Sequence, residues 1–147
     1  MPARSKSAPC WCPFGGRRSC TDGQHFEALT AAVFCARFDA GIVRRRWPAI
    51  RRGFAGFDLG VVASWKEDQV ERLMCEPGMI HNRKKIAATI RNAGELARLA
   101  DRYGSVRAYV RHIRRRRLRL TAEVDRWAHY IGAPSVTCYL RCVGALK

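Results

Sequence analysis

A short turn near the C-terminus has the composition of a phosphate-binding element. Gly132, Ala133, Pro134 and Ser135 precede an apolar segment that begins at Val136. A tight glycine turn before a helix presents unpaired backbone amides to an anion, and the helix dipole favours the negative charge. Proline suits a first helical turn, because its missing N–H would have no partner there. Since such turns are common, this one predicts an anion contact only together with other features.

The N-terminal part holds residue types that bind zinc. Cys10, Cys12 and Cys20 are followed by His25, and zinc takes cysteine and histidine ligands. The Cys-x-Cys spacing lacks the two-residue gap of a zinc knuckle, which favours an unliganded state, so we predict no metal and no cofactor. The 7 cysteines are an odd count at irregular positions, and this favours reduced thiols over a disulfide framework.

The charge balance indicates a polyanionic partner. Lys and Arg number 28 against 12 acidic residues, which gives a formal net charge of +16. Such an excess attracts nucleic acid through counterion release, although a basic composition that serves only solubility would look the same. Residues 114–117 are four arginines in a row, with Arg107, Arg111 and Arg119 nearby. They form either a solvated face or a contact for phosphate oxygens, which match the arginine fork.

Helices must position these side chains. Apolar residues recur every three or four positions from Arg83 to Tyr103, which predicts one long amphipathic helix with Asn82 as its cap. Shorter segments with helical spacing are found at 26–38, 42–54, 59–64, 70–74, 106–113, 121–127 and 136–143. Their expected caps and breakers are Asp58, Ser105, Thr121, Gly104 and a proline, Pro48, that marks a helix start or kink.

We therefore predict an all-α protein of about seven helices. Residues 24–147 are expected to form a single compact helical domain, and residues 1–23, rich in Pro, Gly and basic residues, a flexible tail. No apolar run approaches the ~20 residues that span a bilayer, and the N-terminus lacks the apolar core of a signal peptide. We expect a cytoplasmic monomer without membrane association.

Three segments in a fixed order carry a family resemblance. Residues 70–73 read Val-Glu-Arg-Leu, residues 78–86 read Gly-Met-Ile-His-Asn-Arg-Lys-Lys-Ile, and residues 90–93 read Ile-Arg-Asn-Ala. Together they resemble the middle of the 3-methyladenine DNA glycosylase I family, which belongs to the helix-hairpin-helix DNA glycosylases. The resemblance extends roughly from Phe26 to Gly144, and residues 129–135 match the family's hairpin, with Tyr130 where many such motifs have a first glycine. It identifies the chain as a shortened and divergent member.

The resemblance implies a pocket that this chain builds differently. A carboxylate in the first helix and a tryptophan a few residues later recognise the base in the family, but Ala32 and Ala40 stand at those positions. The implied replacements for the catalytic carboxylate are Asp39 or Glu27. The aromatic residues available for a base pocket are Phe34, Phe38, Trp47 and Tyr139, for each of which core packing is the competing role. The implied contacts to the DNA backbone are Tyr130, Gly132, Ala133, Ser135, Arg83, Lys84 and Lys85.

Two functional hypotheses follow. The first is a 3-methyladenine-type DNA glycosylase that hydrolyses the N-glycosidic bond of alkylated adenine in duplex DNA during base excision repair. An N3-alkylated adenine is cationic and leaves readily once it is held outside the stack, so no covalent nucleophile is required. The second is a non-catalytic protein of the same fold that binds nucleic acid through charge, which Ala32 and Ala40 favour. The family's zinc site uses a Cys and a His near the N-terminus and a His and a Cys after the last helix, and no such final pair precedes Lys147.

Overall fold

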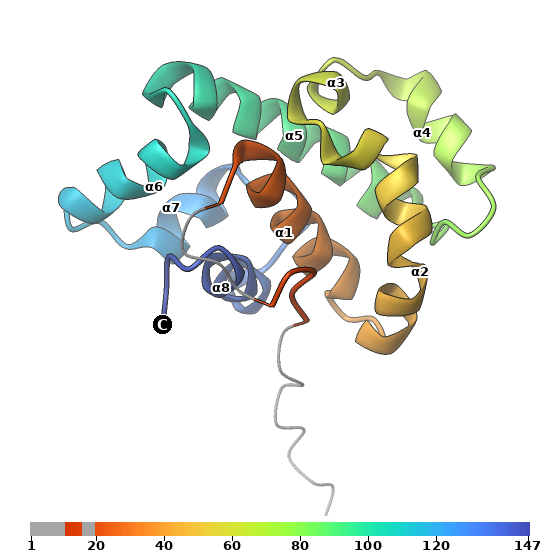
Figure 1. Cartoon of the computed structure of the whole chain (residues 1–147), viewed down its shortest axis with the longest axis horizontal. Helices are drawn as coiled ribbons and strands as arrows, with labels where there is room; N and C mark the ends of the chain where they lie inside the picture. The colour runs from red at the N-terminus through yellow and green to blue at the C-terminus, as the bar shows by residue number, and fades with distance from the viewer. Residues whose placement is uncertain (1–10, 16–19) are drawn as a thin grey trace, which may run out of the picture.

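The computed structural model describes residues 11–15 and 20–147, and this part of the chain is helical between short connections. Its elements follow each other without any strand in these described residues (Figure 1). They are α1 (Asp22–Cys35), α2 (Ala40–Gly53), the 3-10 helix η1 (Ala55–Phe57), α3 (Leu59–Ala63), α4 (Glu67–Met74), α5 (Arg83–Tyr103), α6 (Val106–Arg115), α7 (Leu120–Trp127) and α8 (Ala133–Cys142). The all-α prediction is confirmed.

Side-chain caps explain where several helices begin. The Asn82 side chain accepts from the Lys85 amide at the start of α5, and Ser105 does the same for Ala108 at the start of α6. Asp58 caps α3 by accepting from the Val61 amide. Gly104 ends α5 with φ 92, a left-handed conformation that glycine adopts at little cost. These caps were all predicted from the sequence.

Two local predictions were wrong. Pro48 lies inside α2 rather than at a helix start. The helix continues through it, at the cost of the one hydrogen bond that proline cannot donate. Thr121 does not cap α7, which begins one residue earlier at Leu120 with Arg119 as its N-cap residue.

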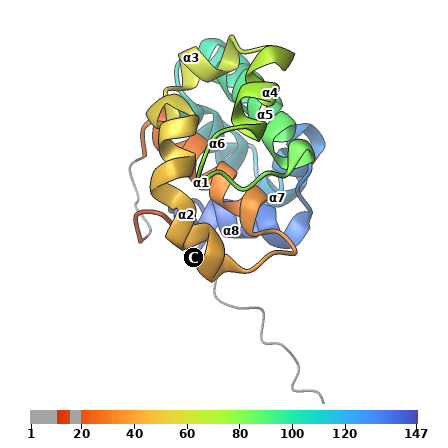
Figure 2. The same cartoon turned by 90° about the vertical axis from the view of Figure 1, so that its right-hand side faces the viewer.

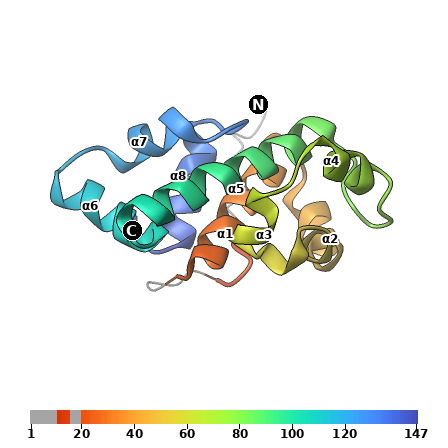
Figure 3. The ribbon, with the colours of Figure 1, turned by 90° about the horizontal axis from the view of Figure 1, so that it is seen from above.

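Helices α1 and α5 form the middle of the molecule. Helix α5 runs along its length (Figure 3), and α1 lies inside, with other helices around it in Figures 1 and 2. Helix α1 packs against both α5 and α8, while α3 and α6 pack against α5. As a result, α2 to α4 lie on one side of the α1–α5 pair and α6 to α8 on the other. The two ends of α1 therefore lie beside different loops.

Aromatic rings fill the core on the α2 side. Phe54 and Phe57 are stacked with their ring centroids 6.1 Å apart, and Trp47 stacks on Phe57 at 5.4 Å. Phe26 and Phe34 of α1 meet the same cluster edge to face, Phe26 on Phe57 and Phe34 on Phe54. Because aromatic side chains bury large apolar areas, this cluster fixes α1 against α2.

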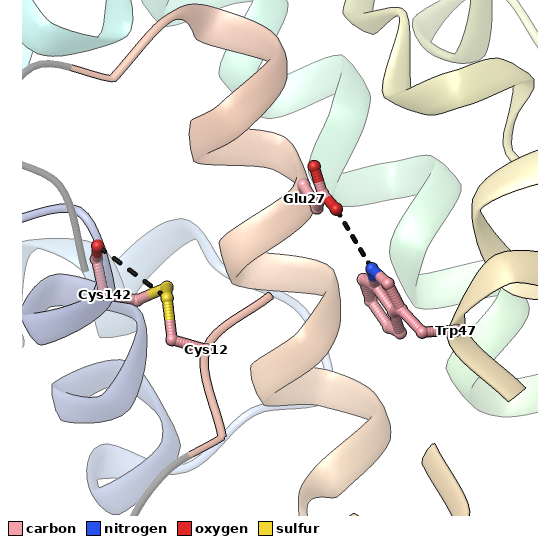
Figure 4. Close-up of a disulfide and its surroundings, with 4 residues drawn as sticks. All are labelled: Cys12, Glu27, Trp47 and Cys142. Carbon is pink, nitrogen blue, oxygen red and sulfur yellow. Dashed lines mark hydrogen bonds between the residues drawn. A yellow bond between two sulfur atoms is a disulfide. The ribbon is translucent and has the colours of Figure 1, made fainter. Parts of the chain in front are cut away.

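The described part of the N-terminal region differs from the expected flexible tail. Trp11 packs edge to face on Trp47 with a centroid distance of 5.0 Å. Cys12 forms a disulfide with Cys142 at the end of α8, which Figure 4 shows. Residues 11–15 therefore lie against the helical domain, and α1 begins at Asp22, before the expected boundary at residue 24. Residues 1–10 and 16–19 of the predicted tail lie outside the described residues.

The prediction of reduced thiols was wrong for part of the cysteines. Cys12 and Cys142 are bonded to each other, and Cys138 is also disulfide-bonded. Cys35 and Cys75 are thiols. Cys12 and Cys142 are 130 positions apart, so no local pattern could have paired them.

Within the described residues, no helix combines the length and the apolar character that crossing a membrane would need.

Candidate functional site

A cavity opens where the end of α1, the start of α5 and the hairpin before α8 meet. Its volume is ≈ 540 Å³. It is lined by Ala36, Arg37, Phe38, Asn82, Lys85, Tyr130, Ile131, Gly132, Pro134 and Ser135. Three connections that are far apart in the sequence thus build one hollow, which we call the hairpin pocket.

The hairpin presents its turn to solvent. Gly132 is exposed and is the N-cap residue of α8, with Pro134 in the first turn. The Ser135 and Val136 amides already donate to the Gly132 carbonyl, and Pro134 has no N–H. In the described part of the chain, the Gly132 and Ala133 amides have no recorded partner. Two amides without a partner therefore lie at the positive end of a helix in exposed residues, as an anion contact requires.

Tyr130 adopts a backbone conformation that explains why related motifs often have a glycine at this position. Its φ is 58, in the left-handed region where a side chain costs free energy. The ring is 50% exposed and lines the hairpin pocket. The preceding residue is fixed from α5, because the Asn92 side chain donates to the His129 carbonyl and accepts from the His129 amide. The hairpin therefore has a rigid attachment to the long helix.

Lys85 connects the start of α5 to the end of α1. Its Nζ donates to the Phe34 carbonyl at 2.7 Å and to the Ala36 carbonyl at 2.9 Å, and the residue is only 5% exposed. Burial lowers the pKa of this ammonium group from its ordinary value, and the nearby Cys35 partly opposes the shift. The family resemblance implied a DNA-backbone contact for Lys85, whereas in the structure this side chain is buried and holds the end of α1 beside the hairpin pocket.

Phe38 lines the pocket with an exposed ring, and Asp39 is the next residue in the chain. Phe38 is 42% exposed, and the Lys85 Nζ lies 5.1 Å from its ring centroid. Asp39 is exposed and caps α2, with its Oδ1 accepting from the amides of Gly41 and Ile42. Asp39 is not among the lining residues, but it follows directly after one that is.

Glu27 lies elsewhere and is fully engaged. Its Oε1 accepts from Trp47 Nε1 at 3.0 Å, as Figure 4 shows, and its Oε2 accepts from Arg51 at 2.7 Å. The residue is buried on α1, nine positions before Ala36. A carboxylate so paired keeps α1 and α2 together, and it does not reach the hairpin pocket.

Of the four aromatic candidates for the pocket, the structure brings only Phe38 to the hollow. Phe34 and Trp47 belong to the aromatic core described above, at 0% and 7% exposure. Tyr139 is 1% exposed, and its hydroxyl is hydrogen-bonded to His25 near the C-terminal end of α8. Core packing is what the structure shows for these three residues.

The other predicted cations lie on the surface. Arg83 forms an ion pair with Glu71 across the connection between α4 and α5. Lys84 is exposed. Ala133 and Ser135 lie in the first turn of α8, which begins at Ala133 and not at Val136 as the sequence predicted.

A sequence model of the methyladenine glycosylase family matches residues 14–132. This chain belongs to the methyladenine glycosylase family. Solved structures agree in fold. A variant of 3-methyladenine DNA glycosylase I from Staphylococcus aureus superposes with a TM-score of 0.76 at 17% identity, covering 88% of this chain and 81% of that one. A second structure from the same organism, described as the basis of 3-methyladenine recognition, gives 0.75 at 17% identity over 88% and 80%.

A solution structure of a 3-methyladenine DNA glycosylase I, whose description concerns alkylated base recognition, has a TM-score of 0.72 at 19% identity. It covers 90% of this chain and 81% of the other. The family match and the shared fold together support a 3-methyladenine DNA glycosylase-like function. The family acts on DNA that carries alkylated bases, so DNA is the expected substrate.

The resemblance places the family's two pocket positions at Ala32 and Ala40, and neither residue lines the hairpin pocket. Ala32 is buried on α1, one turn before Ala36, so both face the same way. Ala40 begins α2 just after Phe38 and Asp39. The lining residues contain two cations, Arg37 and Lys85, and no carboxylate.

The family's zinc ligands do not fit the residues found here. Cys12 and Cys142 share a disulfide, so neither offers a thiolate to a metal. The His25 Nδ1 is 2.7 Å from the Tyr139 hydroxyl, and Cys10 lies outside the described residues. Among the described residues, no three His, Cys, Asp or Glu side chains are grouped to hold a metal ion.

Sequence reasoning missed four residues of the pocket, Ala36, Arg37, Asn82 and Ile131. Arg37 has φ 52, and this left-handed turn directs the chain from α1 into the mouth. Asn82 was predicted only as a helix cap, and Ile131 was not singled out, yet both line the hollow. Their sequence neighbours Phe38, Lys85 and Gly132 were identified. Closeness to these residues in the sequence was therefore the signal that could have found the missed ones.

Proposed function

We propose that this chain excises N3-alkylated adenine from duplex DNA in base excision repair, with the hairpin pocket as the receptor for the extruded base. The observation that supports this most is an exposed glycine turn with two outward amides directly beside a hollow of ≈ 540 Å³. An enzyme that acts on a base must grip the backbone and take the base out of the stack at adjoining places. The proposal includes a monomeric protein and a cytoplasmic location.

In this proposal the backbone is held first. The amides of Gly132 and Ala133, with the Ser135 hydroxyl, donate to a phosphate next to the lesion. Tyr130 contacts the duplex with its exposed ring. Lys84 adds charge from the start of α5, while Lys85 keeps the end of α1 in place by donating to its carbonyls.

The extruded base then enters beside Phe38. An exposed aromatic ring at the mouth offers a stacking face, and the uncharged polar side chains of Asn82 and Ser135 are among the wall residues. The alkylated base is cationic and leaves as a neutral molecule when the glycosidic bond breaks. Arg37 and Lys85 disfavour the bound cation more than the departing neutral base, so the pocket promotes release without holding the charged base tightly.

Asp39 is the proposed catalytic carboxylate. It is the acidic residue next to the lining segment, and only its Oδ1 has a recorded hydrogen bond within the described residues. From this place a carboxylate can stabilise the developing positive charge on the sugar or orient the attacking water. Glu27 does not fit this role, because two donors already engage its carboxylate.

The test is release of free 3-methyladenine from alkylated duplex DNA by the purified chain, with Asp39→Asn as the variant. Asparagine also caps helices, so this change removes the charge and keeps the fold of α2. Asp58→Asn is the matched control, because Asp58 is another exposed carboxylate that caps a helix. We expect about a hundredfold slower release for Asp39→Asn. For Asp58→Asn we expect no change in the release rate. Equal release rates in all three proteins would show that Asp39 is not the catalytic carboxylate.

No release by the unaltered, folded chain at stoichiometric enzyme would overturn the proposed activity. The same preparations would then show whether binding to DNA falls steeply with salt and ignores the lesion, as a protein that binds only through charge would.

A further inference from the structure

A second hollow lies at the other end of the molecule from the hairpin pocket. Its volume is ≈ 340 Å³, and it is formed by one side of α6, the start of α1 and the residues after α8. The lining residues are His25, Arg107, Val110, Arg111, Arg114, Arg115, Val143, Gly144 and Ala145. We call it the arginine pocket.

The two pockets lie at opposite ends of the same two helices. His25 is in the first turn of α1, and Ala36 follows its last residue, so the helix separates them by roughly 16 Å. In the same way, Gly132 precedes α8 and Val143 follows it. When DNA is bound at the hairpin, its lesion and the neighbouring phosphates therefore lie away from the arginine pocket.

Four arginines share one side of α6 at this hollow. Positions 107, 111, 114 and 115 recur at the spacing that aligns side chains on a helix face. All four are exposed. In the part of the chain that the structure describes, the recorded ion pairs use other arginines. Four positive charges gathered without carboxylate partners repel one another, so the cluster favours an anion.

The hollow also contains a buried polar side chain. His25 is 2% exposed, and its Nδ1 is 2.7 Å from the Tyr139 hydroxyl. Burial raises the pKa of the Tyr139 phenol and keeps its proton in place. When that hydroxyl donates to Nδ1, the ring proton of the neutral histidine is on Nε2 and can be donated to an anion. The nearby carboxylate of Asp22 is engaged at 2.9 Å by the Val106 amide.

We propose that the arginine pocket is a binding site for a compact polyphosphate anion, such as inorganic tripolyphosphate or the phosphate chain of a nucleotide. The guanidinium fork matches phosphate oxygens in geometry, and several forks around a concave site suit a ligand with several phosphate groups. The site is separate from the proposed excision of bases. It gives the protein a second anion contact that DNA at the hairpin leaves accessible.

Calorimetric titration of the full chain with inorganic tripolyphosphate tests this site. Arg111→Gln combined with Arg114→Gln is expected to weaken binding at least about tenfold, because charge-assisted hydrogen bonds are lost. The matched control is Arg46→Gln with Arg52→Gln, which removes two exposed arginines from α2 and changes the net charge equally. We expect less than about a twofold change for the control. Thermal unfolding of both variants checks that they fold.

A second arm uses an undamaged DNA duplex in place of tripolyphosphate. If the two variants weaken duplex binding equally, the duplex is held elsewhere, and the polyphosphate assignment is supported. If tripolyphosphate does not bind, or if both variants weaken it equally, the proposal is overturned. It is also overturned if the α6 variant weakens only duplex binding, since the phosphate would then be that of a DNA backbone. None of these outcomes depends on whether the chain excises bases.

Discussion

The two ends of the α1–α8 pair use positive charge in different ways. At the hairpin end, the proposed anion contact consists of backbone amides, while the buried Lys85 ammonium is engaged by two carbonyls. At the other end, four exposed arginines of α6 surround a smaller hollow. Backbone donors have a fixed direction and therefore position a ligand, whereas long arginine side chains attract charge and adapt to its shape. Charge counted from sequence does not distinguish these two uses.

The ends are also attached differently. Hydrogen bonds from Asn92 and Lys85 hold the hairpin end, whereas the disulfide between Cys12 and Cys142 joins the arginine end to the N-terminal segment. Four substitutions test how the two ends differ.

The largest expected effect is loss of the disulfide. Cys12→Ser opens a link across 130 positions, and the chain-entropy relation gives about 5 kcal/mol for a loop of that order. We expect urea unfolding to show a loss of that size and the arginine pocket to weaken more than base excision does. Cys75→Ser, which alters an exposed thiol, should leave stability within about 0.5 kcal/mol. Equal stability of the two variants would contradict this role for the disulfide.

His25 should make the arginine end sensitive to acid. Burial is the main cause that lowers its pKa from 6.5 to about 4, with Asp22 opposing and Arg107 adding to the shift. Above pH 6.5 the ring is neutral in both states and adds no pH dependence. As pH falls from 6.5 to 4 the unfolded chain takes up the proton first, so stability decreases by roughly 3 kcal/mol. Unfolding measured across this range should show a smaller decrease for His25→Gln, and parallel curves would refute the expectation.

Lys85→Met should destabilise the hairpin end. The change leaves the Phe34 and Ala36 carbonyls without their donor, which costs about 2 kcal/mol. Lys84→Met removes the same charge from an exposed neighbour and should change stability by less than about 0.5 kcal/mol. Denaturant titrations compare the two variants directly. A similar small change in both would mean that the end of α1 does not depend on this clamp.

The smallest effect is expected at the pocket mouth. Phe38→Ala removes the proposed stacking face and should slow excision about tenfold, since stacking of a base on an aromatic ring contributes ~1–3 kcal/mol. Leu118→Ala is the control, because Leu118 is exposed to nearly the same extent, 45% against 42%, and lies on the connection between α6 and α7. Rates of 3-methyladenine release decide between them. An unchanged rate for Phe38→Ala would place the base elsewhere.

Local rules predicted much of the secondary structure. Capping by Asp58, Asn82 and Ser105, and the stop at Gly104, depend only on residues within one helical turn. The ordered segments from Val70 to Ala93 were enough to predict the family, which the match over residues 14–132 confirms. Boundaries were less accurate where a favourable packing face outweighed a local signal, as at Pro48.

The site was predicted only in part, because aromatic and charged residues have the same appearance in sequence whether they are buried or exposed. Trp47 and Tyr139 were candidates for the pocket, and tertiary contacts make them core residues. Phe38 was an aromatic candidate of the same kind, but it lies at the mouth of the pocket. The difference depends on which neighbours cover each ring, and those neighbours come from distant helices.

The amino-acid sequence by itself determined the helices, their caps and the exposed glycine turn, because each depends on the preferences of a few adjacent residues. Only the tertiary structure decided where the charges act. It turned Lys85 inward to satisfy the carbonyls that end α1, engaged Glu27 with Trp47 and Arg51, and joined Cys12 to Cys142. Buried polar groups must find partners wherever the fold brings them, and that requirement acts between residues that are far apart along the chain.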